Sequence, residues 1–155
     1  HGSQDATHHL IKKGAKVNDR DKDSETALMA AARQGHAQLI QILVENGADV
    51  EAKSNVGNTA LHLAADAGRE TAAKGLLDSG ADINAENNVR NTPILLAAAS
   101  GHAAVVKLLL DNGADPDVKN KRKETATSLA QVRNHKRVVQ LIEEYKKNKG
   151  SFSLF

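Results

Sequence analysis

The chain contains no cysteine and no tryptophan, and its only aromatic residues are two Phe and one Tyr among 155 residues. Without cysteine there is no disulfide framework, no thiolate nucleophile and no zinc site built on sulfur ligands. With so few aromatic side chains, the core has to be packed by Ala, Leu, Ile and Val. Such small side chains fill thin layers better than a thick centre, so the composition favours stacked helices.

Long apolar segments and a strong net charge are also missing. No apolar run approaches the roughly 20 residues of a transmembrane helix, and the N-terminus lacks the pattern of a signal peptide. The formal net charge of +2 favours neither nucleic acid nor a membrane as partner. Residues 1–86 carry nine basic and thirteen acidic side chains, whereas residues 87–155 carry twelve basic and six acidic ones. We therefore expect an intracellular protein, cytoplasmic or nuclear, that is electrically polar along its length.

A 33-residue repeat runs through the sequence. Four threonines lie 33 residues apart, at Thr26, Thr59, Thr92 and Thr125. The segments that begin at these threonines align without insertion: TALMAAARQGH, TALHLAADAGR, TPILLAAASGH and TATSLAQVRNH. Gly-Ala pairs recur with the same period. Self-similarity at a period of this length is typical of repeat proteins.

Each unit predicts two short helices followed by a polar turn. The threonine can cap the first helix by accepting a hydrogen bond from a free backbone N–H group, and Pro93 suits the first helical position. The second helix has apolar residues at helical spacing, such as Leu39, Ile40 and Leu43, and ends before a glycine. One helix pair cannot bury both of its faces, so the units must stack on one another. We therefore expect an all-α repeat solenoid.

The segments TALHLAA at 59–65 and TPILLAA at 92–98, with GADIN at 80–84, resemble the ankyrin repeat. The resemblance covers residues 5–147 and implies a helix-turn-helix with a β-hairpin-like finger in each unit, in about four full repeats after a partial one. It also implies a non-enzymatic adaptor or scaffold module that binds a protein or peptide without a cofactor or metal. The expected organisation is a tag remnant (1–3), a partial repeat (4–20), full repeats (21–53, 54–86 and 87–119), a C-terminal capping repeat (120–148) and a flexible tail (149–155).

The two ends of the array depart from the repeat pattern. Residues 5–15 resemble only the second helix of a unit, so we expect either that the chain begins within a longer array or that a tag replaced its natural start. The last unit is unusually polar, with Asn134 and Lys146 at the usual glycine positions, which is typical of a capping unit with a wettable outer face. The tail SFSLF at 151–155 is either a disordered end or a docking motif.

No pattern of residues predicts catalysis or metal binding. One histidine recurs in each full unit, at His36, His62, His102 and His135, and histidines that are one repeat apart do not converge on one ion. The aspartates Asp49, Asp82 and Asp115 recur in the same way and are typical of turns. The resemblance also raises one modification, hydroxylation of Asn84 by an asparaginyl hydroxylase that reads the leucine eight residues upstream, Leu76. The alternative is that Asn84 only completes the turn.

The resemblance implies that a partner binds to the finger tips and to the exposed flank of the first helices. We call this set of residues the finger strip. Its members are Lys22, Asp23, Glu25, Arg33 and Gln34 in the first full unit, Asn55, Val56, Asn58 and Asp66 in the second, Asn88, Val89, Asn91 and Ser100 in the third, and Lys121, Arg122, Glu124, Val132 and Arg133 in the last. The small residues Ala67 and Ala99 lie beside them. The strip changes from mixed charge through neutral to basic.

The finger strip has no aromatic residue, although binding hot spots favour Trp, Tyr and Arg. Arg33, Arg122 and Arg133 are therefore the best available anchors. We expect a monomeric protein with modest, salt-sensitive affinity for an acidic or extended peptide.

Two other functions compete with the binding module. The basic cluster KNKRK at 119–123, with Lys146, Lys147 and Lys149, is an alternative nucleic-acid or nuclear-import site. Nucleic acid is not the expected partner, because aromatic residues for base stacking are absent from this end. The third possibility is a regulatory fragment of a larger enzyme or channel.

Overall fold

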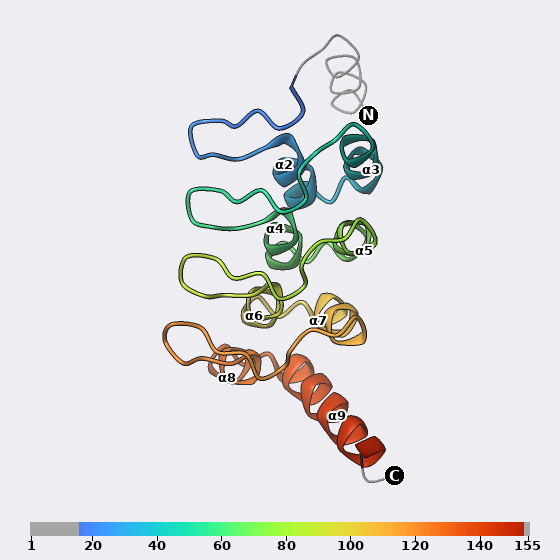
Figure 1. The fold of residues 1–155 in the computed structure, drawn as a ribbon. Helices are drawn as coiled ribbons and strands as arrows, with labels where there is room; N and C mark the ends of the chain where they lie inside the picture. The colour runs from blue at the N-terminus through green and yellow to red at the C-terminus, as the bar shows by residue number, and fades with distance from the viewer. Residues whose placement is uncertain (1–15, 154–155) are drawn as a thin grey trace.

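The computed structural model describes residues 16–153 of the chain (Figure 1). Its helices form pairs in chain order: α2 (Ala27–Gln34) with α3 (Ala37–Glu45), α4 (Ala60–Asp66) with α5 (Glu70–Asp78), α6 (Pro93–Ala99) with α7 (Ala103–Asp111), and α8 (Ala126–Val132) with α9 (Lys136–Ser153). Residues 4–15 of the predicted partial repeat and residues 154–155 of the SFSLF tail lie outside the described residues. The unit boundaries given above stay predictions.

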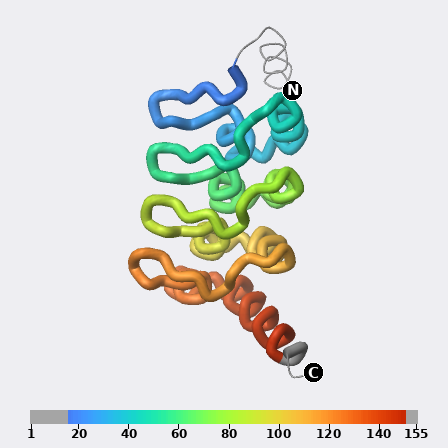
Figure 2. The backbone as a smooth tube through the Cα atoms, in the orientation of Figure 1, coloured from blue at the N-terminus to red at the C-terminus, as the bar shows by residue number. Residues whose placement is uncertain are grey.

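The pairs stack into two rows of helices. The inner row consists of α2, α4, α6 and α8, and the outer row consists of α3, α5, α7 and α9; each helix packs on its neighbours in the row and on its own pair. The polar turns project as a column of fingers on the inner side (Figures 1 and 2). The predicted all-α solenoid is therefore confirmed.

The inner row can pack closely because alanines recur on its buried faces. Ala31, Ala32, Ala64, Ala65, Ala97 and Ala98 are all buried between neighbouring helices. The outer row contributes larger residues, since Leu43, Leu76 and Leu109 recur 33 residues apart and are fully buried. Leu28, Leu61 and Ile94 of the inner row are also buried, so each layer of the core combines alanines at the contacts between inner helices with larger aliphatic residues from both rows.

Turns between paired helices need a left-handed backbone. Gly35, Gly68 and Gly101 have φ between 72° and 79° there, and Asn134 takes the same conformation in the last unit with φ of 61°. A Cβ atom on Gly101 would lie 2.6 Å from Nδ1 of His135, so the next repeat also requires a glycine at this position. The turn that joins the two helices of a unit therefore also contacts the following unit.

The fingers resemble β-hairpins without being assigned as strands in the part of the chain that the structure describes. The backbone N–H of Ser54 donates to the carbonyl of Asn58 at 3.0 Å, and Asn87 and Asn120 make the equivalent bonds. The finger tip has a left-handed residue, which is Gly57 in one unit and Ser24, Arg90 or Lys123 in the others. A left-handed conformation costs a non-glycine residue roughly 1–2 kcal/mol.

The C-terminal end differs from the sequence-based prediction. Helix α9 does not end near Lys146 but continues to Ser153, so residues 149–153, predicted as a flexible tail, are helical. Glu143, Glu144 and the lysines around Tyr145 favour helix, and Gly150 opposes it most strongly, by about 1 kcal/mol. No helix among residues 16–153 is long and apolar enough to cross a membrane.

Candidate protein-binding surface

The C-terminal half of the finger strip lines a single hollow. The hollow has a volume of about 410 Å³ and lies between the fingers and helices α6 and α8. Eight residues predicted for the strip line it: Asp66, Val89, Asn91, Ser100, Lys121, Arg122, Glu124 and Arg133. The structure therefore brings together side chains from three successive units. It does not place Lys22, Asp23, Glu25, Arg33, Gln34, Asn55, Val56, Asn58, Asn88 or Val132 in this hollow.

Sequence reasoning missed the apolar lining of the hollow. Leu96 and Leu129 are half-buried and line it beside Ala99. Their spacing could have revealed them, because Leu96 precedes Ala99 by three residues and Ser100 by four, which places them on one helix face. The hollow is thus lined by apolar residues of α6 and α8 together with polar and charged residues.

Exposed apolar residues gather on the finger strip. Among the described residues, the large apolar side chains that are exposed are Val56 (59%), Val89 (52%) and Val132 (85%), and all three belong to the strip. Isolated exposed apolar residues are ordinary on protein surfaces, but here they follow one another along the stack. A partner that covers the strip would remove them from water.

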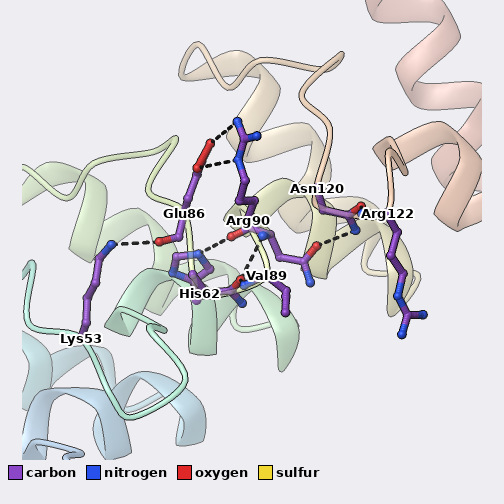
Figure 3. Close-up of polar contacts among 9 residues, drawn as sticks. Lys53, His62, Glu86, Val89, Arg90, Asn120 and Arg122 are labelled. Atoms are coloured by element: carbon purple, nitrogen blue, oxygen red, sulfur yellow. Dashed lines mark hydrogen bonds and ion pairs between the residues drawn. The ribbon is translucent and has the colours of Figure 1, made fainter.

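The three arginines predicted as anchors have different surroundings. Nη2 of Arg33 pairs with Oε1 of Glu25 at 2.5 Å, and this hydrogen bond raises the pKa of Arg33. Nη1 of Arg133 donates to the carbonyl of Ala99 at 3.4 Å. Within the described residues, the side chains of Arg122 and Lys121 have neither an ion pair nor a hydrogen bond, and Arg122 points away from the polar network (Figure 3). In the first unit the two strip cations are matched by Asp23 and Glu25, whereas in the last unit three strip cations face only Glu124, so the excess of positive charge is at the C-terminal end of the strip.

Several strip residues connect the fingers to one another. Nδ2 of Asn120 donates to Oδ1 of Asn91 at 2.9 Å and to Oε1 of Glu124 at 3.0 Å. Asn58 accepts the equivalent bond from Asn87 at 2.9 Å. These amides are partly buried, and their hydrogen bonds hold the finger bases in register. Their role in the structure is to position the hollow.

His62 fastens helix α4 to the next finger. Its ring is fully buried; Nδ1 accepts from the backbone N–H of Thr59 at 3.0 Å, and Nε2 donates to the carbonyl of Asn91 at 2.8 Å (Figure 3). Burial is the main cause that lowers the pKa of His62, so the imidazole is neutral.

The repeating histidines occupy two kinds of position. His62 lies in the first turn of an inner helix, whereas His36, His102 and His135 precede outer helices. Nε2 of His102 lies 2.9 Å from the carbonyl of Asp66, and Nε2 of His135 lies 3.0 Å from that of Ala99. These contacts join successive units. No group of three His, Asp or Glu side chains among residues 16–153 is placed to hold a metal ion.

The alternative basic site is divided in the structure. Lys119, Lys121, Arg122 and Lys123 lie exposed on the last finger. Lys146 of α9 pairs with Asp117, and Lys149 lies 5.7 Å above the ring of Tyr145. The C-terminal end of α9 lies away from the tip of that finger (Figure 1).

The surroundings of Asn84 restrict access by a hydroxylase. Oδ1 of Asn84 accepts from the N–H of Asp115 at 3.2 Å, and Leu76 is fully buried. An enzyme that reads Leu76 needs an opened repeat, so hydroxylation stays a prediction.

Stacked helix pairs with a column of fingers define a repeat protein that displays an open surface along its length. Residues 1–87 match the family model for ankyrin repeats in three copies, and residues 90–121 match the model for a single ankyrin repeat. The chain belongs to the ankyrin-repeat family. Proteins of this family are generally non-catalytic modules for protein–protein interaction. No curated protein matches the chain.

Proposed function

We propose that the protein is an adaptor module that binds an acidic peptide segment of a partner protein in the hollow at the C-terminal half of the finger strip. The observation that carries this proposal is the hollow itself, where the apolar lining of Leu96 and Leu129 adjoins the unpaired cations of Lys121 and Arg122. An apolar side chain of the partner fills the hollow, and a neighbouring carboxylate meets the guanidinium of Arg122.

The charge distribution supports an acidic segment as the partner. Arg33 is compensated by Glu25 and Lys22 adjoins Asp23 in the chain, so the strip has no excess of positive charge in the first unit, whereas Arg122 lacks a carboxylate partner among the described residues. Rim charges act mainly on the association rate and are screened by salt. The affinity is therefore expected to fall as salt is added.

A labelled peptide of alternating Glu and Leu or Phe residues tests the proposal. Fluorescence anisotropy is expected to show saturable binding that weakens at least about tenfold when Arg122→Glu and Arg133→Glu are combined, because two attractive contacts become repulsive. Arg137→Glu is the matched control, since it reverses an exposed cation of α9 that does not line the hollow. Unchanged affinity in the double variant overturns the proposal, and tighter binding of a short DNA duplex than of the peptide favours the nucleic-acid alternative.

A further inference from the structure

An open groove crosses the outer row of helices between α3 and α5. Its volume is about 570 Å³, and the residues that line it include Ile40, Val44 and Gly75. A Cβ atom on Gly75 would meet no atom within 4 Å. The other outer helices have a half-buried apolar residue at this repeat position: Ile42, Leu108 and Leu141. The groove is therefore open at the place where α5 lacks the side chain that the other outer helices carry.

A second departure from the repeat pattern lies on the same groove. Helices α5 and α7 each pair an aspartate with a lysine one turn earlier, Lys74 with Asp78 at 3.5 Å and Lys107 with Asp111 at 2.7 Å. In α3 the corresponding residues are Gln41 and Glu45, and Nε2 of Gln41 donates to Oε1 of Glu45 at 3.1 Å. Glu45 thus has a neutral partner, whereas the equivalent residues Asp78 and Asp111 each have a lysine. Helix α9 also carries Gln140 and Glu144, but it keeps Leu141.

We propose that this groove is a second docking site, whose occupant is an amphipathic helix of a partner protein that bears a large apolar side chain next to a lysine or arginine. The apolar side chain fills the space above Gly75 and packs on Ile40 and Val44. The cation of the partner pairs with Glu45. It thereby takes the place of the lysine that α5 and α7 carry and that α3 lacks.

Two physical arguments favour a basic helix as the occupant. The ionised residues that line the groove are Glu45, Asp78 and Lys74, and the last two neutralise each other, so the rim is acidic. The finger strip is basic at its C-terminal end, so one acidic partner segment does not suit both surfaces. A glycine inside a helix also opposes local helix stability. Among the outer helices α3, α5 and α7, only α5 contains a glycine, and that glycine lies at the groove.

The test uses two labelled helical peptides that differ in charge. One contains Leu at positions i, i+3, i+4 and i+7 with Lys elsewhere on an Ala background, and the other has Glu in place of Lys. In fluorescence anisotropy, the Leu/Lys peptide is expected to bind the protein. Gly75→Leu is expected to weaken this binding at least about tenfold by filling the groove. Glu45→Gln is expected to weaken it about threefold and to reduce its salt dependence.

Gly75→Ala is the matched control, because it removes the glycine from the helix but leaves most of the groove open. Both variants at position 75 are expected to raise the midpoint of thermal unfolding. If Gly75→Leu loses binding while Gly75→Ala keeps it, the loss therefore does not result from misfolding. Equal affinity of the Leu/Lys peptide for the protein and for Gly75→Leu, or the absence of saturable binding, overturns the proposal.

A further measurement separates this site from the finger strip and from self-association. Combined Arg122→Glu and Arg133→Glu are expected to leave binding of the Leu/Lys peptide intact, so this site and the finger-strip proposal can fail independently. Sedimentation of the protein alone gives the other decisive result. Dimers that disappear in Gly75→Leu would mean that a second copy of the chain fills the groove, which contradicts a partner helix.

Discussion

Four equivalent threonines precede the inner helices, but their hydroxyl groups have different surroundings. Oγ1 of Thr59 accepts from the N–H of His62, and Oγ1 of Thr125 accepts from that of Ser128. In the described part of the chain, Oγ1 of Thr92 is buried without a hydrogen-bond partner, and Leu95 offers no polar side chain to it. Oγ1 of Thr26 likewise accepts from the N–H of Met29. The same residue type therefore stabilises three helix starts and leaves a polar atom unsatisfied at the fourth.

Replacing these threonines with valine should have opposite consequences. Thr59→Val removes a helix cap and is expected to lower the free energy of unfolding by about 0.5–2 kcal/mol. Thr92→Val removes a buried oxygen that makes no hydrogen bond, so it is expected to be neutral or to stabilise by up to about 1 kcal/mol. Urea unfolding of both variants measures the difference. A loss in Thr92→Val as large as that in Thr59→Val would contradict the assignment.

At the scale of elements, the connections between units depend on polar contacts at the finger bases. His62 of α4 bonds to the finger that precedes α6, and the amides of Asn91 and Asn120 continue the chain of contacts to the last finger. A neutral imidazole is needed, because Nδ1 accepts a hydrogen bond while Nε2 donates one. Protonation of one side chain therefore affects two neighbouring units.

The stability should fall in mild acid because of His62. Burial lowers its folded-state pKa, while in the unfolded chain a histidine titrates near pH 6.5. Below about pH 6.5 the unfolded state binds the additional proton, so stability falls, by up to about 1.4 kcal/mol per pH unit, until the folded pKa is reached. Above that window His62 is neutral in both states and contributes no pH dependence to the stability.

Urea unfolding between about pH 7.5 and pH 5 measures this dependence. His62→Leu, which copies the residue at the equivalent position 95, is expected to have a smaller slope. His102→Gln is the matched control, because it changes a histidine between units and leaves the buried ring in place. A slope in His62→Leu equal to that of the unaltered protein would show that other groups are responsible.

At the scale of the whole molecule, the main contacts of each described unit are with its neighbours in the stack. Contacts between inner helices join α2 to α4, α4 to α6 and α6 to α8. The stability of such an array is approximately a sum of unit stabilities and interface terms. A defect at one interface should therefore separate the array into parts that unfold at different denaturant concentrations.

Ala64→Leu creates such a defect in the middle of the inner row. Ala64 is fully buried in α4, and adding three carbon atoms there is expected to cost about 1–3 kcal/mol. We expect a lower m-value or two separate transitions in urea, followed by far-UV circular dichroism. Ala104→Leu, on the exposed side of α7, is the matched control and should change stability by less than about 0.5 kcal/mol. One sharp transition with an unchanged m-value would contradict the expectation that the two parts of the array unfold separately.

The finger surface was only partly predictable from the sequence. The repeat period placed Val89 one unit before Arg122, and Ser100 one unit before Arg133, because equivalent residues of a stacked array lie one above another. It did not show that Glu25 compensates Arg33, since side-chain orientation decides which charges meet. It also treated Asn58 and Asn91 as contact residues, although their side chains bond to the adjacent fingers.

The sequence by itself determined the architecture. A fixed 33-residue period, threonine caps and glycines at the turns are local signals, and each requires a particular backbone conformation. Only the tertiary structure decided which surfaces are open. The hollow beside Leu96 and the groove above Gly75 depend on side chains from successive units that meet in space. Their shape and charge follow from packing between units, which a repeat pattern read one unit at a time does not contain.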